Sequence, residues 1–243
     1  NKEDLRFGIR PDWPMLQSII QKGLESLTQQ EQMSLVTKWI GANLVDKTLS
    51  SDMAKVSVTE EEQAYLQKLG SIKVCADPDW EPFEMVDDQG KYTGIGADLL
   101  YLVAERLGVP IEVLHTKDWD ESVAASKAGK CQIISFLNQT PKRDEWLIFT
   151  QAHFSDPNIF ITREDHGFIA ELSDWANETI VLPKGTSIED RIREDYPNLK
   201  IITTDTEIQA FEMVSQKQAD IAIRSLIVAA YTIKKEGLFN LKI

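Results

Sequence analysis

The sequence has no run of 18 apolar residues and no contiguous basic stretch. Neither a membrane span nor an export signal is therefore expected within these residues. The chain has 243 residues, of which 39 are acidic and 26 basic, so its formal net charge is −13. Such a charge repels phosphate backbones and anionic lipid surfaces, which makes nucleic acid and membrane surfaces unexpected partners.

Signals of catalysis, metal binding and cofactor binding are also scarce. The three histidines, His115, His153 and His166, show no metal-ligand spacing. Gly94 and Gly96 follow a predicted turn but lack the third glycine of a dinucleotide-binding loop, and no GxSxG motif is present. These absences predict a binding protein that needs no cofactor, rather than an enzyme.

Only two cysteines occur, Cys75 and Cys131, and each lies in or beside an apolar, strand-like run. They could form a disulfide, but two cysteines on neighbouring parallel strands must lie at matched heights to do so. The sequence does not supply that information, so two buried free thiols are the favoured expectation.

The N-terminal part is predicted to be a strand followed by two helices. LRFGIR alternates apolar and polar residues, and Leu16, Ile19 and Ile20 recur at helical spacing. Thr28 and Glu31 form a capping-box pattern that begins a second helix, which ends at Gly41. Residues 42–58 have the composition of a linker, and Thr59 with Glu62 begins a further helix, so residues 42–70 are predicted to be a linker and a helix.

From Ile72 onwards, short strands alternate with helices in a β-α-β-α-β order, and the same order recurs after residue 154. This order predicts α/β folding with parallel sheets covered by helices. We expect two lobes, residues 71–153 and 154–243, with the crossover at 154–162. A cleft between two such lobes is the expected place for a ligand.

Five segments in order carry a family resemblance: LTQQEQMSLVTKWIG, VTEEEQAYLQKLGSIKVCADPDWEPFEMVDDQGKYTGIGADLL, LNQTPKRDEWLIFTQAHF, LPKGTS and KQADIAI. They resemble the bacterial extracellular solute-binding proteins of family 3. The DPDWEPFE segment after a TEEEQAYL helix is most similar to tandem periplasmic sensor modules of hybrid histidine kinases and diguanylate cyclases. The resemblance covers nearly the whole chain and implies a two-lobed periplasmic-binding-protein type II (Venus flytrap) fold.

One feature departs from the family pattern. In the family, a strand-helix-helix unit closes a module, whereas here residues 1–41 precede the module that starts at Ile72. Residues 1–41 can be the tail of a preceding module in a tandem array. They can also dock onto the following module and complete it, as in a circular permutation, and the two interpretations are compatible.

The resemblance implies ligand contacts at Asp77, Trp80, Phe83, Trp119, Asn138, Arg143, Lys184, Gly185, Thr186, Ser187, Arg224 and Ser225. Arg143 is the strongest candidate, since a guanidinium offers two parallel donors to a carboxylate. Its alternative role is an exposed ion pair with Asp144 or Glu145, and Trp80 can equally be a core aromatic residue. The Lys184–Ser187 segment opens a predicted helix, whose amides can meet an anion or simply be capped.

Ser225 stands where amino-acid binders of this family carry an aspartate for the ligand ammonium, and Arg224 precedes it. If Arg143 and Arg224 both face the ligand, the site favours an anion such as a carboxylate. If they do not, the module can have lost its ligand and act as a signalling spacer.

Three functional classes follow. The resemblance favours a periplasmic sensory module of an inner-membrane receptor, which binds a small carboxylate or an amino-acid-like ligand. Its partners would be a neighbouring flytrap module, membrane-bound signalling domains and, in a homodimer, a second copy. The alternatives are the solute-binding receptor of an ABC-type amino-acid importer and a lobe fused to a catalytic domain that these residues do not contain.

Overall fold

The computed structural model describes residues 2–40, 56–87, 89–169 and 177–243. The chain forms two compact units. We call Asp4–Ser155 the N-terminal unit, and Asp156–Ile243 with the residues up to Glu3 the C-terminal unit. None of the described helices is long and apolar enough to cross a membrane.

The sheet of the N-terminal unit has the strand order β1-β7-β2-β6, and β8 also pairs with β1. Its strands are β1 (Lys2–Ile9), β2 (Ile72–Cys75), β6 (Ile111–Leu114), β7 (Ile133–Asn138) and β8 (Ile148–Phe149). As predicted, β2 is parallel to β6 and β7. The sheet is not wholly parallel, however, because β1 runs antiparallel to both β7 and β8.

Strand β1 is an internal strand of the N-terminal unit. The side chains of Leu5, Phe7 and Ile9 are fully buried, as expected for alternate residues that face one core. Leu5 pairs with Asn138 and Ile9 with Ile133, while Gly8 pairs with Phe149 on the other side. The first residues of the chain therefore contribute both backbone pairing and core volume to this sheet.

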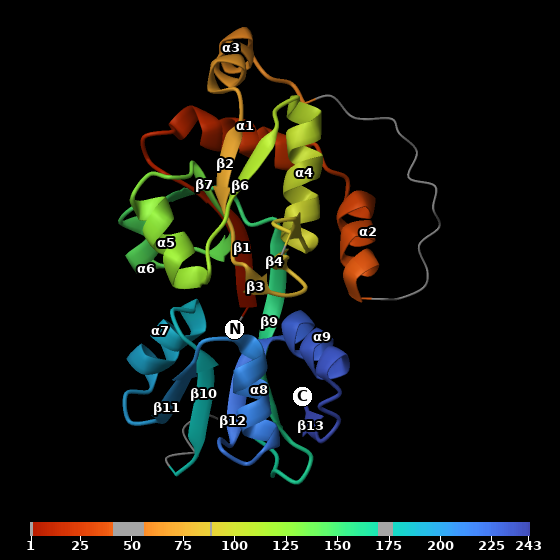
Figure 1. Ribbon diagram of the computed structural model, residues 1–243, viewed down its shortest axis with the longest axis vertical. Coiled ribbons are helices and arrows are strands. Elements are labelled where there is room, and N and C mark those ends of the chain that lie inside the picture. The colour runs from red at the N-terminus through yellow and green to blue at the C-terminus, as the bar shows by residue number, and fades with distance from the viewer. Residues whose placement is uncertain (1, 41–55, 88, 170–176) are drawn as a thin grey trace. The chain divides into compact units, whose positions relative to one another are not determined.

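Six helices are described in this unit: α1 (Pro14–Glu25), α2 (Gln29–Ile40), α3 (Glu60–Leu69), α4 (Ile95–Leu107), α5 (Trp119–Lys127) and α6 (Pro141–Asp144). Both predicted capping boxes are present, at Thr28 with Glu31 and at Thr59 with Glu62. Helices α1 and α2 both pack on α4 (Figure 1). The predicted linker lies mostly outside the described residues.

The contact between α1 and α4 is close because α1 carries a glycine there. A Cβ atom on Gly23 would lie 2.5 Å from Cγ1 of Val103. Beside this contact Lys22 forms an ion pair with the buried carboxylate of Glu62 at 2.7 Å. Arg106 on α4 donates to the carbonyl of Ser26 at 2.6 Å and to the carboxylate of Glu31. Residues 4–40 are thus fixed by apolar packing and by charged contacts with later residues.

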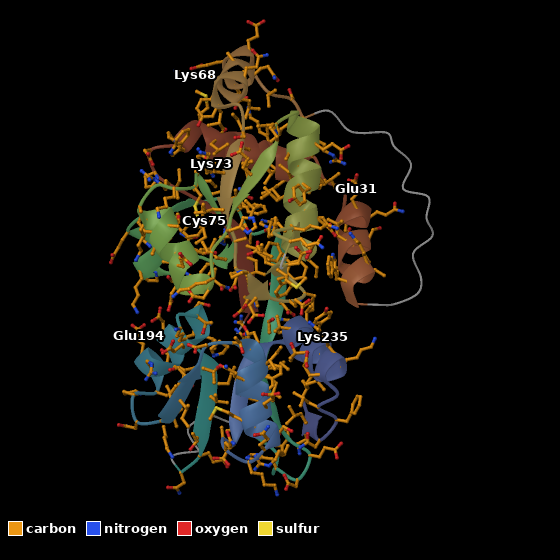
Figure 2. The ribbon with its side chains drawn as sticks, in the orientation of Figure 1. Glu31, Lys68, Lys73, Cys75, Glu194 and Lys235 are labelled. Atoms are coloured by element: carbon orange, nitrogen blue, oxygen red, sulfur yellow. A yellow bond between two sulfur atoms is a disulfide. The ribbon has the colours of Figure 1, made fainter. Side chains whose placement is uncertain are left out.

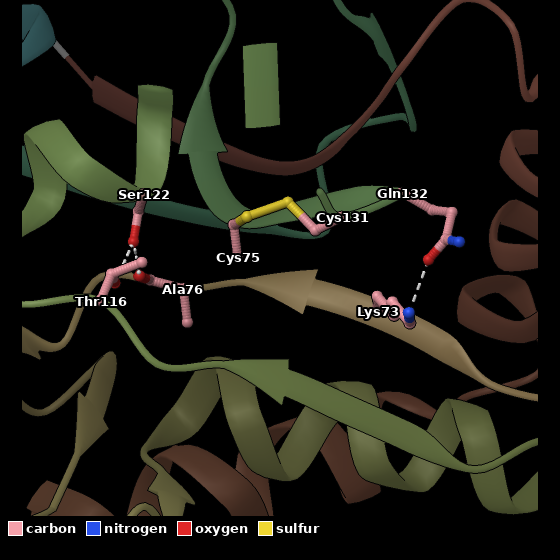
Figure 3. The surroundings of a disulfide bond; sticks show 7 residues. All are labelled: Lys73, Cys75, Ala76, Thr116, Ser122, Cys131 and Gln132. Atoms are coloured by element: carbon pink, nitrogen blue, oxygen red, sulfur yellow. Dashed lines mark hydrogen bonds between the residues drawn. A yellow bond between two sulfur atoms is a disulfide. The ribbon is translucent and has the colours of Figure 1, made fainter. Parts of the chain in front are cut away.

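The expectation of two free thiols was wrong, because Cys75 and Cys131 form a disulfide (Figure 3). Cys75 ends β2 and pairs in register with Ile134, and Cys131 lies just before β7. The offset brings the two Cα atoms to 5.8 Å, which is within the range that a disulfide spans. Gln132 also accepts a hydrogen bond from the Lys73 amide at 2.7 Å, which fixes the same pair of strands.

A small antiparallel sheet, β3-β4-β5, was not predicted. It consists of β3 (Asp79–Trp80), β4 (Glu84–Val86) and β5 (Tyr92–Thr93). Its strands have only two or three residues, which is too short for an alternating pattern to be recognised.

The C-terminal unit has the strand order β11-β10-β12-β9 and ends with the first residues of β1, while β13 also pairs with β9. Its elements are β9 (Phe154–Arg163), β10 (Thr179–Pro183), α7 (Ser187–Asp195), β11 (Lys200–Thr204), α8 (Glu207–Ser215), β12 (Ile221–Ser225), α9 (Leu226–Glu236) and β13 (Leu241–Lys242). Strand β10 is parallel to β11 and β12, and β9 is antiparallel to β12. Helix α9 was not predicted.

The charged side chains lie mainly on the surface of each unit. Lys68 on α3, Glu194 on α7 and Lys235 on α9 are all exposed (Figure 2). Among the exceptions, Glu84 and Asp156 are buried near candidate site residues, whereas Glu62 is buried beside Lys22.

Candidate functional site

In the N-terminal unit, the loop after β2 carries the candidates Asp77, Trp80 and Phe83. The Asp77 side chain accepts a hydrogen bond from the Asp79 amide at 3.0 Å, which closes a tight turn. Trp80 is 6% exposed and Phe83 is fully buried, and their rings lie edge to face at 5.0 Å. Both rings also approach Phe136 on β7. Most of the Trp80 ring therefore packs in the core of this unit.

The far end of this loop is held by helix α4. The amides of Ile95 and Gly96 donate to the carbonyls of Pro82 and Phe83 at 2.9 and 2.8 Å. A Cβ atom on Gly94 would collide with the Phe83 carbonyl, and Gly94 has a φ of +121°. Only glycine fits this position, so the helix can begin directly against the loop.

Glu84 holds the near end of the loop, and no sequence pattern indicates this role. Its side chain is fully buried and accepts from the Asp77 amide at 3.1 Å and from the hydroxyls of Tyr92 and Ser135. Burial raises the pKa of this carboxyl to about 7, although the three donors lower it. Burial also raises the pKa of Tyr92 well above its usual value, and the neighbouring Glu84 adds to the effect.

Arg143, Asn138 and Trp119, three candidate ligand residues, lie in contact within the N-terminal unit. The Arg143 guanidinium donates to the Asn138 carbonyl at 2.9 Å and lies 5.5 Å from the centre of the Trp119 ring. Thr140 caps the short helix α6 by accepting from the Arg143 amide. Asp144, one of the alternative partners of Arg143, accepts from Gln139 at 2.8 Å.

This arrangement orients a half-buried guanidinium. A guanidinium has five N–H donors, of which the Asn138 carbonyl takes one, and the Trp119 face restricts its plane. A planar, oriented guanidinium matches the geometry of a carboxylate.

In the C-terminal unit, Lys184, Gly185, Thr186 and Ser187 lie at the start of α7. Thr186 caps the helix, accepting from the Glu189 amide and donating to the Pro183 carbonyl at 2.9 Å. The Glu189 carboxylate accepts from the Gly185 amide at 2.8 Å, and Lys184 forms an ion pair with Asp205 at 2.9 Å. One backbone amide of this segment is thus already hydrogen-bonded to a carboxylate of the protein, and the charge of that carboxylate opposes binding of a second anion there.

Arg224 is 4% exposed and forms ion pairs inside the C-terminal unit. Its guanidinium lies 2.5 Å from the Glu207 carboxylate and 3.7 Å from that of Glu3. Two carboxylates therefore flank one cation. The positive charge that would make this region attract an anion is neutralised by the protein itself.

Ser225 is fully buried at the N-cap of α9, and a carboxylate lies beside it. Asp156 on β9 is 2% exposed and accepts from the Ile227 amide at 2.9 Å. Burial raises the pKa of Asp156, while the hydrogen bond from the Ile227 amide lowers it. Asp156 was not identified from the sequence, because the pairing of β9 with β12 places it near Ser225 and no local pattern marks it.

Within the described residues, no group of three or more histidine, cysteine or acidic side chains could hold a metal ion. Each unit thus carries its own set of candidate residues, made up of hydrogen-bonding, aromatic and charged side chains. An arginine is oriented in the N-terminal unit, and carboxylates are in excess over cations in the buried cluster of the C-terminal unit.

Two α/β units with polar residues beyond the strand ends have an architecture typical of small-molecule-binding proteins. Family comparison agrees: residues 72–236 match the bacterial extracellular solute-binding proteins, family 3, and the chain belongs to that family.

Two relatives and one solved structure illustrate the similarity. The chain is 24% identical over 238 residues to the virulence sensor protein BvgS of Bordetella pertussis, covering 98% of this chain and 19% of BvgS. It is 24% identical over 189 residues to the L-cystine-binding protein TcyA of Bacillus subtilis, covering 74% of this chain and 66% of TcyA. The periplasmic VFT2 domain of B. pertussis BvgS has a similar fold, with a TM-score of 0.69 at 22% identity over 77% of this chain and 80% of that domain. The chain therefore has a Venus flytrap, periplasmic-binding-protein fold, and it spans about a fifth of the BvgS length.

Proposed function

We propose that this chain is a periplasmic, ligand-binding sensory module of a membrane-bound signalling receptor, and that it binds without catalysis. The observation that supports this most is the extent of the similarity to BvgS. It covers 98% of the chain and thus includes the strand-helix-helix segment that precedes the family match. The similarity to TcyA covers only 74% of the chain.

The ligand that we propose is a small molecule with a carboxylate, of the amino-acid type. Arg143, oriented by Asn138 and Trp119, would grip the carboxylate. In the C-terminal unit, Arg224 is neutralised and Asp156 carries a buried carboxyl beside Ser225. In that unit this balance favours a positively charged group such as an ammonium over a second anion, and a zwitterion carries both of the groups that the two units favour separately.

The remaining partners are part of the same proposal. A neighbouring flytrap module, membrane-bound signalling domains and a second copy of the receptor would transmit the bound state. The alternative is a solute-binding receptor of an importer, which the similarity to TcyA supports. The full-length gene product distinguishes these, since only a sensor continues into signalling domains.

A thermal-shift screen of the amino acids and small carboxylates tests the binding, because a ligand that binds only the native state raises the melting temperature. With a compound that binds, Arg143→Ala should weaken the affinity by about tenfold to a hundredfold, since a charged hydrogen bond contributes roughly 1.5–3 kcal/mol. The melting temperature of the ligand-free variant should hardly change, because Arg143 is only half-buried.

Lys142→Ala is the matched control, since Lys142 is an exposed cation on the same short helix. Equal affinity losses in both variants, or undiminished affinity in Arg143→Ala, would contradict the role of Arg143. A panel without any binder would favour the signalling-spacer interpretation.

A further inference from the structure

The loop Asp77–Phe83 is anchored at two ends by different chemistry. At Pro82 and Phe83, two backbone amides of α4 donate to two backbone carbonyls, and neither group titrates. At Asp77 the backbone amide donates to the side chain of Glu84. Only the second anchor depends on the charge state of a side chain.

Glu84 is unusual because it is buried without a cation. It forms none of the ion pairs found among the described residues, and the charge of Asp77 opposes its ionisation. The donors around it are one backbone amide and the hydroxyls of Tyr92 on β5 and Ser135 on β7. A further titratable group, Tyr101 on α4, has its ring 5.9 Å from that of Tyr92.

The two hydroxyls make it possible for the cluster to accept a proton without refolding. Tyr92 and Ser135 lie 2.7 Å apart, and either hydroxyl can be the donor. A hydroxyl can rotate from donating to accepting, so a proton on Glu84 finds an acceptor in the same place. The Asp77 amide cannot reverse in this way, because it is a donor only.

We propose that Glu84 is a proton-responsive positioning residue, whose charge state sets how firmly the start of the loop Asp77–Phe83 is held. Ionised Glu84 accepts a charge-assisted bond from the Asp77 amide, and protonated Glu84 accepts a weaker, neutral one. Asp77 and Trp80 are candidate ligand contacts, so ligand binding would respond to pH through the loop. This consequence for binding rests on the proposed function. The loop's attachment itself can be measured without a ligand.

The test follows the Asp77 backbone amide of the ligand-free chain by ¹⁵N NMR from about pH 5 to about pH 9, a range that lies above the usual pKa of a glutamate and is centred on the raised pKa of Glu84. The amide shift should show one step at about pH 7, the pKa to which burial raises Glu84, with faster hydrogen exchange on the acid side beyond the intrinsic pH effect. Glu84→Gln should abolish the step. Tyr92→Phe should move its midpoint upward, because the lost hydroxyl stabilises the ionised carboxylate.

Asp77→Asn is the matched control and should keep the step, since it removes the neighbouring carboxylate whose charge acts on Glu84. A step that survives in Glu84→Gln, that disappears in Asp77→Asn, or that is missing from the wild type would overturn the proposal. If Glu84→Gln does not fold, an unmoved midpoint in Tyr92→Phe still overturns it. A ligand screen without binders refutes the proposed function alone, so the two failures are distinguishable.

Discussion

At the scale of single residues, Arg143 and Arg224 show how differently one side-chain type can be used. Arg143 is half-buried and its guanidinium is oriented by a carbonyl and an indole ring. Arg224 is buried against the carboxylates of Glu207 and Glu3. The sequence identified both as candidates, but the burial of Arg224 depends on partners 17 and 221 positions away in the chain, which no local pattern reveals.

Removing the Arg224 charge should be costly for folding. Arg224→Met leaves the buried carboxylates of Glu207 and Glu3 without their cation, and the loss of one partner of a buried ion pair costs roughly 3–5 kcal/mol. The free energy of unfolding in urea measures this. Lys184→Met, which breaks an exposed ion pair with Asp205, should cost about 0–1 kcal/mol. Similar losses in the two variants would show that Arg224 has no special part in stability.

At the scale of helices and strands, local chemistry was a good guide to helix starts. The Thr-x-x-Glu patterns at Thr28 and Thr59 both form capping boxes, because the side chain and backbone groups involved are three residues apart. Strand pairing was harder to predict from the sequence. Strand β1 pairs with strands more than 120 residues away, and its antiparallel direction depends on those contacts. The disulfide likewise depends on the offset between β2 and β7.

The disulfide should stabilise the N-terminal unit appreciably. Cys75 and Cys131 are separated by 56 positions. A cross-link over such a loop restricts the unfolded chain and thereby raises the free energy of unfolding by about 2–4 kcal/mol. Urea unfolding of the Cys75→Ala/Cys131→Ala variant should show a loss of this size. Dithiothreitol should reduce the stability of the wild type and leave the variant unaffected. A wild type that is equally stable with and without reductant would contradict this prediction.

At the scale of the whole molecule, the residues that match the family and the residues that form the folded N-terminal unit have different boundaries. Residues 72–236 match the family, whereas the sheet of the N-terminal unit also includes β1, which lies outside the match. The α/β class, the two-part organisation and the family could all be predicted from the sequence. Asp156 and Glu84 could not, since their importance comes from burial and from partners that only the folded chain brings together.

Residues 1–40 should therefore be needed for folding. Deleting them removes the fully buried side chains of Leu5, Phe7 and Ile9 and exposes the paired edge of β7. Each large core side chain contributes roughly 1.5–3 kcal/mol on burial, a sum comparable with the stability of a whole domain. We expect an aggregating protein or one without a cooperative melt. If calorimetry shows that the truncated chain is monomeric and has the wild-type melting temperature, the segment does not contribute to the stability of the fold.

The close approach at Gly23 restricts which other segments could occupy the place of residues 4–40. A competitor must supply a strand with large apolar residues at every second position, as at Leu5, Phe7 and Ile9. Fourteen positions after Ile9 it must have glycine, because Val103 leaves no room for a Cβ atom, and a cation immediately before it to meet Glu62. These requirements can be checked in any sequence, so candidate segments can be sorted into those that could replace residues 4–40 and those that could not.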